Sequence, residues 1–268
     1  MRQNIMLKEV SYYSLAAFAN VMALITAVLA STALWQSQQL LLQFVLPSIT
    51  IASILWLAWR VKQVALVHPL SSAIKAIKVC WVSVLFCSAG DLVNQNLWQQ
   101  YHRQDPVIRH DYLIDSIWFF APGYGLLLYL LLRFLRQVIG LSSNALWLAI
   151  ALATGMGLLS FVMMSLNSAS HYSLLLAGGY TVLMANLGVF AVILATFALK
   201  RNDIMLMAVA AGFLLATLAD AVIGQFWLFG NNGLGYFPVA RNVNWVMYTL
   251  SQSLVLLFPL ILLRHYKK

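Results

Sequence analysis

Residues 172–198 read YSLLLAGGYTVLMANLGVFAVILATFA, and not one of them is charged. An apolar run of about 20 residues is long enough to cross a hydrocarbon core about 30 Å thick as an α-helix. Such continuous runs are typical of membrane helices, whereas a membrane barrel is built from alternating segments of about 10 residues. Seven further runs resemble this one, at 14–34, 40–60, 76–99, 113–135, 144–166, 204–229 and 243–263. We therefore predict an all-α polytopic membrane bundle of about eight transmembrane helices.

The composition of the whole chain agrees with this prediction. Of its 268 residues, 62% are hydrophobic and 9% are charged, and the mean hydropathy is +0.84. A soluble domain is about half apolar and about a quarter charged. Little of the chain is left for a soluble domain, so we expect one transmembrane domain over residues 1–268.

The distribution of the basic residues predicts the orientation. Basic residues near the ends of membrane spans are retained on the cytoplasmic side. Three of them, Arg103, Arg109 and Arg241, fall on one side of the predicted spans, and 13 fall on the other. The 13 are Arg2, Lys8, Arg60, Lys62, Lys75, Lys78, Arg133, Arg136, Lys200, Arg201, Arg264, Lys267 and Lys268. This split predicts cytoplasmic N- and C-termini in a multi-pass protein of a bacterial cytoplasmic (inner) membrane, and it accounts for the net charge of +9 without a nucleic-acid partner.

A weak internal repeat divides the chain into two halves. Asp-x6-Trp occurs at Asp91 in the third span and again at Asp220 in the seventh. After a longer outer connection, Asp115-x2-Trp opens the fourth span and Asn242-x2-Trp opens the eighth. We predict a tandem four-helix repeat with halves 1–140 and 141–268, related by an axis along the membrane normal.

Asp91 and Asp220 are the candidate catalytic residues. Each lies some 13 to 16 residues from the cytoplasmic end of its predicted span, about 20–24 Å along the helix and hence in the outer half of the bilayer. A carboxylate at that depth is costly unless it is paired, protonated or wetted. The two acids are interpreted as a carboxylate pair with separated pKa values, one acid and one base. The alternative is that each holds helices together by hydrogen bonding.

Polar residues gather near these two acids in the outer half of the predicted bundle. Tyr248 and Gln252 are four residues apart and therefore share a face of the last span. For Asp115 and Asn242, which begin their predicted spans, helix capping is the alternative to a role in binding. The predicted substrate-binding residues are Tyr248, Gln252, Asn94, Asp115, Tyr124 and Asn242.

Several classes of active site lack their motif in the sequence. No pair of histidines has metal-binding spacing inside a span, and we predict no metal and no cofactor. A serine elbow, a glycine-rich phosphate loop and a redox pair of cysteines are all missing, which argues against a serine hydrolase, a nucleotide enzyme or a redox protein.

The seventh and eighth spans resemble the YhhN family of lysoplasmalogenases. The resemblance rests on GFLLATLADA at 212–221, on Phe226 and on YTLSQSL at 248–254, and Gly90-Asp91 is similar to the family's other Gly-Asp motif. It covers about a third of the chain. The resemblance implies a membrane hydrolase that cleaves the vinyl-ether bond of a lysoplasmalogen, and such cleavage needs an acid and a base but no nucleophilic side chain.

A second resemblance points to a different class of protein. The pattern of Gly-Asp, an outer loop, and then Asp115, Trp118 and Tyr124 is similar to multi-span sensory domains that precede GGDEF-type cyclases and histidine kinases. It implies a membrane module that binds a ligand and works with a partner membrane protein. A small-molecule transporter is a third possibility, because a parallel repeat with buried acids suits it equally. The leading hypothesis is the lipid hydrolase.

Overall fold

The computed structural model describes residues 2–30, 45–66, 71–95, 111–163, 170–224 and 238–266, and within these ranges it is almost entirely helical, without strands. Six helical segments of the described chain are long and apolar enough to cross a membrane, and α1 adds a shorter apolar stretch, Tyr13–Leu29. The predicted all-α membrane bundle is confirmed. The elements are α1 (Arg2–Ala30), α3 (Leu46–Leu66), α4 (Ser71–Gln95), α5 (Asp111–Phe134), η2 (Leu135–Ile139), α6 (Ser143–Val162), α7 (His171–Arg201), α8 (Ile204–Val222), α9 (Pro238–Val255) and α10 (Phe258–Tyr266).

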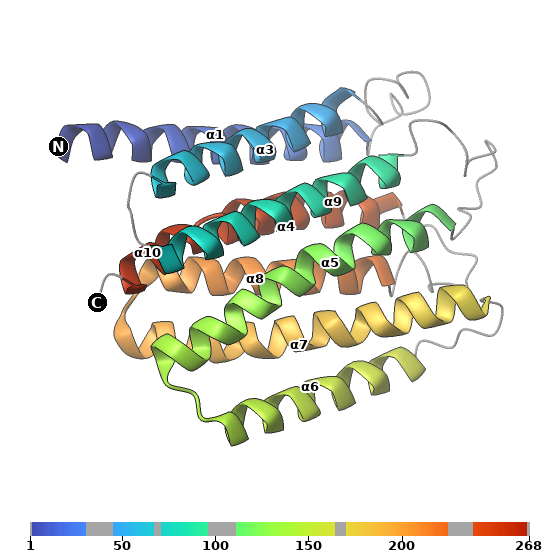
Figure 1. Cartoon of the computed structure of the whole chain (residues 1–268). Coiled ribbons are helices and arrows are strands. Elements are labelled where there is room, and N and C mark those ends of the chain that lie inside the picture. The colour runs from blue at the N-terminus through green and yellow to red at the C-terminus, as the bar shows by residue number, and fades with distance from the viewer. Residues whose placement is uncertain are drawn as a thin grey trace.

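Successive helices run in opposite directions across one bundle (Figure 1), except that α10 continues in the direction of α9. Helices α1 and α3 pair at one edge, α6 packs on α7 at the other, and α4, α5, α7, α8 and α9 lie between them. The largest cluster of buried hydrophobic residues lies in this middle part and includes Tyr124, Phe190 and Phe213. Helix α6 is the most exposed of the six candidate spans, with Trp147 and Met156 on its open face. That face is apolar, as a surface in contact with lipid must be.

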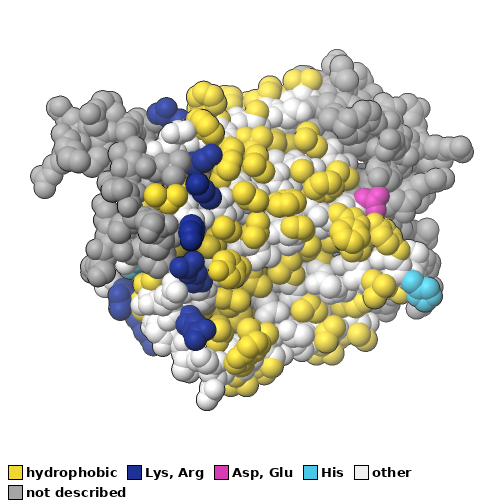
Figure 2. All heavy atoms as spheres, viewed as in Figure 1, with side chains coloured by type: hydrophobic (Ala, Val, Ile, Leu, Met, Phe, Trp, Pro, Cys, Tyr) yellow, Lys and Arg dark blue, Asp and Glu magenta, His cyan; other side chains and the backbone are white. Residues whose placement is uncertain are grey.

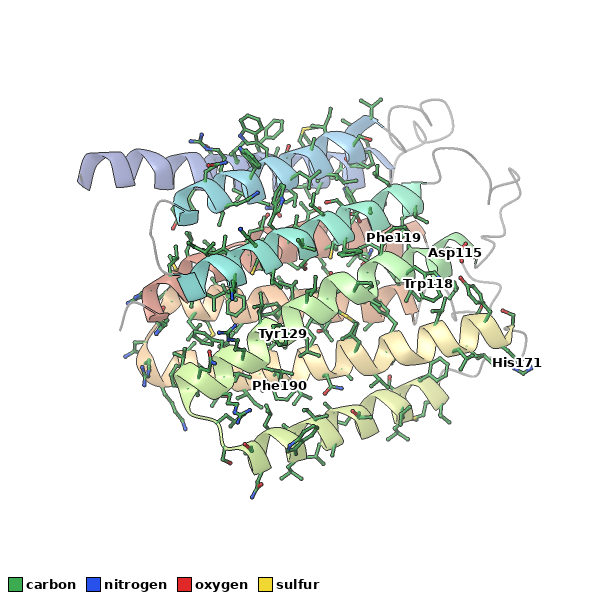
Figure 3. The ribbon with its side chains drawn as sticks, viewed as in Figure 1. Asp115, Trp118, Phe119, Tyr129, His171 and Phe190 are labelled. Atoms are coloured by element: carbon green, nitrogen blue, oxygen red, sulfur yellow. The ribbon has the colours of Figure 1, made fainter. Side chains whose placement is uncertain are left out.

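The two ends of the bundle differ in charge. The start of α1 and the end of α10 lie at the same end (Figure 1), and Figure 2 shows the exposed Lys and Arg side chains in a band near that end. His171 and Asp115 lie at the opposite end (Figure 3). This is the arrangement that the basic-residue count predicts, so the basic end is called the inner end below and the opposite end the outer end.

Several predicted span boundaries are wrong. Helix α5 begins at Asp111 and α9 at Pro238, so Asp115 and Asn242 lie inside their helices and do not cap them. The eighth span is not one continuous helix, because Leu256 and Leu257 form a turn between α9 and α10. Pro259 accounts for the break: it has no N–H for the carbonyl of residue 255, and its ring crowds that carbonyl.

Helices α8 and α9 approach each other closely at a glycine. A Cβ on Gly212 would lie 2.8 Å from Leu254 Cβ and 2.9 Å from the backbone nitrogen of Val255. Only a residue without a side chain fits at this distance from another backbone. The contact lies at the inner end of α9, further inward than Tyr248 on the same helix.

Candidate functional site

Asp91 lies in the last turn of α4, near the outer end of the bundle, and is only 6% exposed. Its Oδ2 accepts a 2.7 Å hydrogen bond from the hydroxyl of Tyr248 on α9. Gly90 is needed beside it, because a Cβ there would lie 2.8–2.9 Å from three ring carbons of Phe120. The Phe120 ring also contacts Tyr248 edge-on, with ring centroids 6.1 Å apart. The Gly-Asp pair therefore packs Gly90 on the Phe120 ring and bonds Asp91 to Tyr248, which the same ring contacts.

Asp220 occupies a comparable level on α8 but in a different environment. Its Oδ2 accepts a 2.8 Å hydrogen bond from the hydroxyl of Tyr180 on α7, and its side chain is partly exposed. No other hydrogen bond of the Asp220 side chain is found with the described residues. Each acid is thus held by one tyrosine, but Asp91 is sealed and Asp220 is accessible.

Tyr124 of α5 lies between the two acids. It is completely buried, and its hydroxyl accepts a 3.2 Å hydrogen bond from the Gln252 amide nitrogen. Its ring centroid is 6.5 Å from that of Tyr180. Tyr124 is close enough to interact electrostatically with both Asp91 and Asp220.

The two acids lie near each other, although no hydrogen bond joins them. Within the described chain no basic side chain forms an ion pair with either acid, since the salt bridge found there joins Arg264 to Asp203. We call Asp91, Asp220, Tyr124, Tyr180, Tyr248 and Gln252 the carboxyl–tyrosine cluster. It joins five of the predicted site residues, on α4, α5, α8 and α9, to Tyr180 on α7.

Asp115 is part of a different arrangement. Its Oδ1 accepts a 2.6 Å hydrogen bond from Tyr172, and the Tyr172 hydroxyl accepts a 2.9 Å bond from the Trp118 indole. Trp118 is 60% exposed and Tyr172 is 47% exposed. Figure 3 shows Asp115 and Trp118 near the outer end of α5. These three residues tie α5 to α7 at the surface, outside the carboxyl–tyrosine cluster.

The two predicted asparagines lie further out than the cluster. Asn94 is three residues beyond Asp91 on α4, and its Oδ1 is buried without a hydrogen-bond partner. Asn242 lies six residues before Tyr248 on α9 and is partly exposed. Trp98, Trp227 and most of both predicted outer connections fall outside the described residues.

Tyr180 is a site residue that the sequence analysis missed. Its position in the span could have identified it. Tyr180 lies nine residues after His171, the first residue of α7, and is therefore deeper than the outer surface where aromatic belts lie. The predicted tandem repeat does not reveal it either. Asp91 is bonded from α9 and Asp220 from α7, and these helices do not correspond under that repeat, which stays a prediction.

The chemistry available to the carboxyl–tyrosine cluster is that of protons and hydrogen bonds. It holds two carboxyl groups, three phenol hydroxyls and one amide. The described residues contain no group of three His, Cys, Asp or Glu side chains placed to hold a metal ion. A comparison of the chain with family models, curated proteins and solved structures found no significant match. The resemblance to lysoplasmalogenases therefore stays a prediction, and the function has to be argued from the cluster.

Proposed function

We propose that this integral membrane protein is a lipid hydrolase that uses Asp91 and Asp220 as an acid–base pair, with a vinyl-ether lysolipid as its substrate. One observation carries the proposal: two carboxyl groups in unlike environments, Asp91 buried and Asp220 partly exposed, lie near the buried Tyr124, and each accepts a hydrogen bond from a tyrosine. Pairs of carboxyl groups in unlike environments are how enzymes divide acid and base roles.

The proposed reaction needs no nucleophilic side chain. A carboxylic acid donates a proton to the outer carbon of the vinyl-ether double bond, which leaves an oxocarbenium carbon attached to the ether oxygen. Water adds to that carbon and loses a proton to the second carboxylate. The resulting hemiacetal breaks its bond to the glycerol oxygen, which takes the proton back from the second carboxyl and leaves as an alcohol. The hemiacetal hydroxyl gives its proton to the first carboxylate, and the chain leaves as an aldehyde. One water is consumed, and both carboxyl groups return to their starting protonation states.

The exposure of the two acids suggests how the roles divide. Asp220 is the partly exposed carboxyl, so water reaches it more readily than it reaches Asp91. Asp91 is buried and bonded to Tyr248. In the proposal Asp220 activates the water and Asp91 supplies the proton, while Tyr248 and Tyr180 position the two carboxyl groups.

The experiment is an assay of aldehyde release by the purified protein from a lysoplasmalogen. We expect Asp91→Asn and Asp220→Asn each to abolish release. Asp203→Asn is the matched control, since Asp203 caps α8 at the inner end and lies outside the cluster. Aldehyde release that survives in either cluster variant would remove the mechanism.

A second candidate function is a membrane module that binds a small ligand and works with a partner membrane protein. It is favoured by the tight burial of Tyr124, Gln252 and Asp91, which suits a binding or relay element as well as a catalyst. This function predicts ligand or subunit association with no turnover of any lysolipid. The proposed location for either function is a bacterial cytoplasmic membrane.

A further inference from the structure

Three buried polar atoms at the outer end of the bundle have no hydrogen-bond partner in the described protein. They are Asn94 Oδ1, Asn244 Oδ1 and Trp245 Nε1. Buried polar groups in native proteins are nearly always paired, so an unpaired set calls for an explanation such as a ligand. The cost is higher inside a membrane, where water does not compensate.

The topology places these three atoms at one level. Helix α4 runs outward and α9 runs inward, and the 2.7 Å bond between Tyr248 and Asp91 ties the two helices together. Asn94 is three residues outward of Asp91, about 4.5 Å along the axis. Asn244 and Trp245 are four and three residues outward of Tyr248, about 6 and 4.5 Å along theirs. Two amides and one indole therefore lie about one turn outside the carboxyl–tyrosine cluster, on the two helices that the Tyr248–Asp91 bond joins.

The chemistry of the three atoms defines what they can bind. Two amide oxygens accept hydrogen bonds, and one indole N–H donates. The Trp245 ring stacks on Tyr248 with centroids 6.1 Å apart and an interplanar angle of 27°, and aromatic faces attract cations. Asp91 adds a carboxyl group one turn further in.

We propose that Asn94, Asn244 and Trp245 form a binding site for a primary ammonium group, with the indole N–H bonded to an acceptor beside it. A primary ammonium offers three N–H donors to the two amide oxygens. A quaternary ammonium offers no N–H donor and leaves both oxygens buried and unpaired. A site built for hydrogen bonding rejects a ligand that lacks the bonding group most strongly in this situation. The inference rests on the proposed function, because it selects an ethanolamine over a choline headgroup for the lipid substrate.

The test is binding to the intact protein in detergent, measured as the ligand-dependent rise of its thermal unfolding midpoint. The probes are ester-linked lysophosphatidylethanolamine, lysophosphatidylcholine with the same chain, and free phosphoethanolamine. We expect the ethanolamine lysolipid to bind at least about 10-fold more tightly than the choline lysolipid, as loss of hydrogen bonds to a charged group implies. Equal binding of the two lysolipids would overturn the proposal.

The free headgroup distinguishes two sources of the ammonium. If phosphoethanolamine alone binds as tightly as the lysolipid, the site takes a soluble amine. If only the lysolipid binds, the site takes a lipid headgroup. Either result supports an ammonium site, whereas no shift with any of the three probes would contradict it.

The variants separate a binding role from a structural one. Asn94→Leu and Asn244→Leu remove the buried, unpaired amide oxygens and put apolar groups of similar size in their place, so without ligand the unfolding midpoints should be unchanged or higher. Their affinity for the ethanolamine lysolipid should fall at least about 10-fold, and Trp245→Phe should weaken binding while keeping the aromatic face. Asn186→Leu is the control, because Asn186 is a buried amide on α7 whose nitrogen bonds Thr154 and Val182. Unchanged lysolipid binding in both asparagine variants would refute the site.

The test also separates this inference from the proposed hydrolase. The ester-linked probes contain no vinyl ether, so their binding does not depend on vinyl-ether cleavage. Selective binding without aldehyde release would remove the hydrolase and keep the ammonium site. Aldehyde release with no preference between headgroups would remove the ammonium site and keep the hydrolase.

Discussion

Removal of the Tyr248 hydroxyl tests whether the bond to Asp91 stabilises the bundle. Tyr248 and Asp91 are both at least nine-tenths buried, and their oxygen atoms are 2.7 Å apart. A typical hydrogen bond contributes about 0.5–1.5 kcal/mol in water-soluble proteins, and leaving a buried partner unsatisfied costs about 1–3 kcal/mol. Hydrogen bonds between membrane helices average about 0.6 kcal/mol with a maximum near 1.7. We therefore expect Tyr248→Phe to lower the free energy of unfolding by about 1–2 kcal/mol.

A double-mutant cycle isolates the pairwise energy. The free energies of unfolding of wild type, Tyr248→Phe, Asp91→Leu and the double variant are measured by reversible denaturation in mixed detergent micelles. The coupling energy should be about 1–2 kcal/mol. The comparison cycle pairs Asp91→Leu with Tyr172→Phe, whose hydroxyl bonds Asp115 at the exposed surface. Those two substitutions should be additive within about 0.5 kcal/mol. If the coupling between Tyr248 and Asp91 is no larger than in the comparison cycle, the bond between them contributes nothing to stability.

Three further predictions concern the bundle as a whole. Gly212→Ala should destabilise the protein by about 1–3 kcal/mol, because the added Cβ meets the backbone of α9. Gly179→Ala should be neutral or stabilising in the same denaturation assay, because an added Cβ there has no atom within 4 Å. Cysteines placed at the exposed positions Lys200 and His171 should react with a membrane-impermeant maleimide from opposite sides of the membrane. His171→Cys should be labelled in intact cells, and Lys200→Cys only after lysis. Labelling of both in intact cells would contradict the predicted orientation. Arg264→Gln should reduce stability by less than about 1 kcal/mol, since the arginine side chain of this ion pair is 64% exposed; a larger loss on denaturation would mean that the pair is not screened by water.

The fold could be predicted from the sequence because the bilayer imposes a single rule on every span. An apolar run of sufficient length has to become a helix that satisfies its own backbone, so 172–198 and its counterparts are recognisable without tertiary information. Helix ends are harder to place. Asp115 and Asn242 are good capping residues by type, but α5 and α9 begin four residues before them, and Pro238 in the first turn of α9 was the better signal. Pro259 was overlooked because the apolar run continues through it.

The site could be predicted only in part, because its contacts join residues distant in the sequence. The depth rule singled out Asp91 and Asp220 as acids that need partners, and the four-residue spacing placed Tyr248 and Gln252 on one face. No spacing rule states that Tyr248 reaches Asp91, 157 residues away, or that Gln252 reaches Tyr124, 128 residues away. Those pairings follow from how α4, α5 and α9 pack.

The turn at Leu256 and Leu257 divides the eighth span into two helices with different contacts. Helix α9 carries Tyr248 and Gln252, whereas α10 packs on α3, α4 and α8 near the inner surface. Because the regular hydrogen-bond ladder is interrupted between them, a distortion of α10 is taken up at the turn and does not rotate the side chains of α9. The inner end can therefore accept sequence changes in α10 with little effect on the geometry around Asp91.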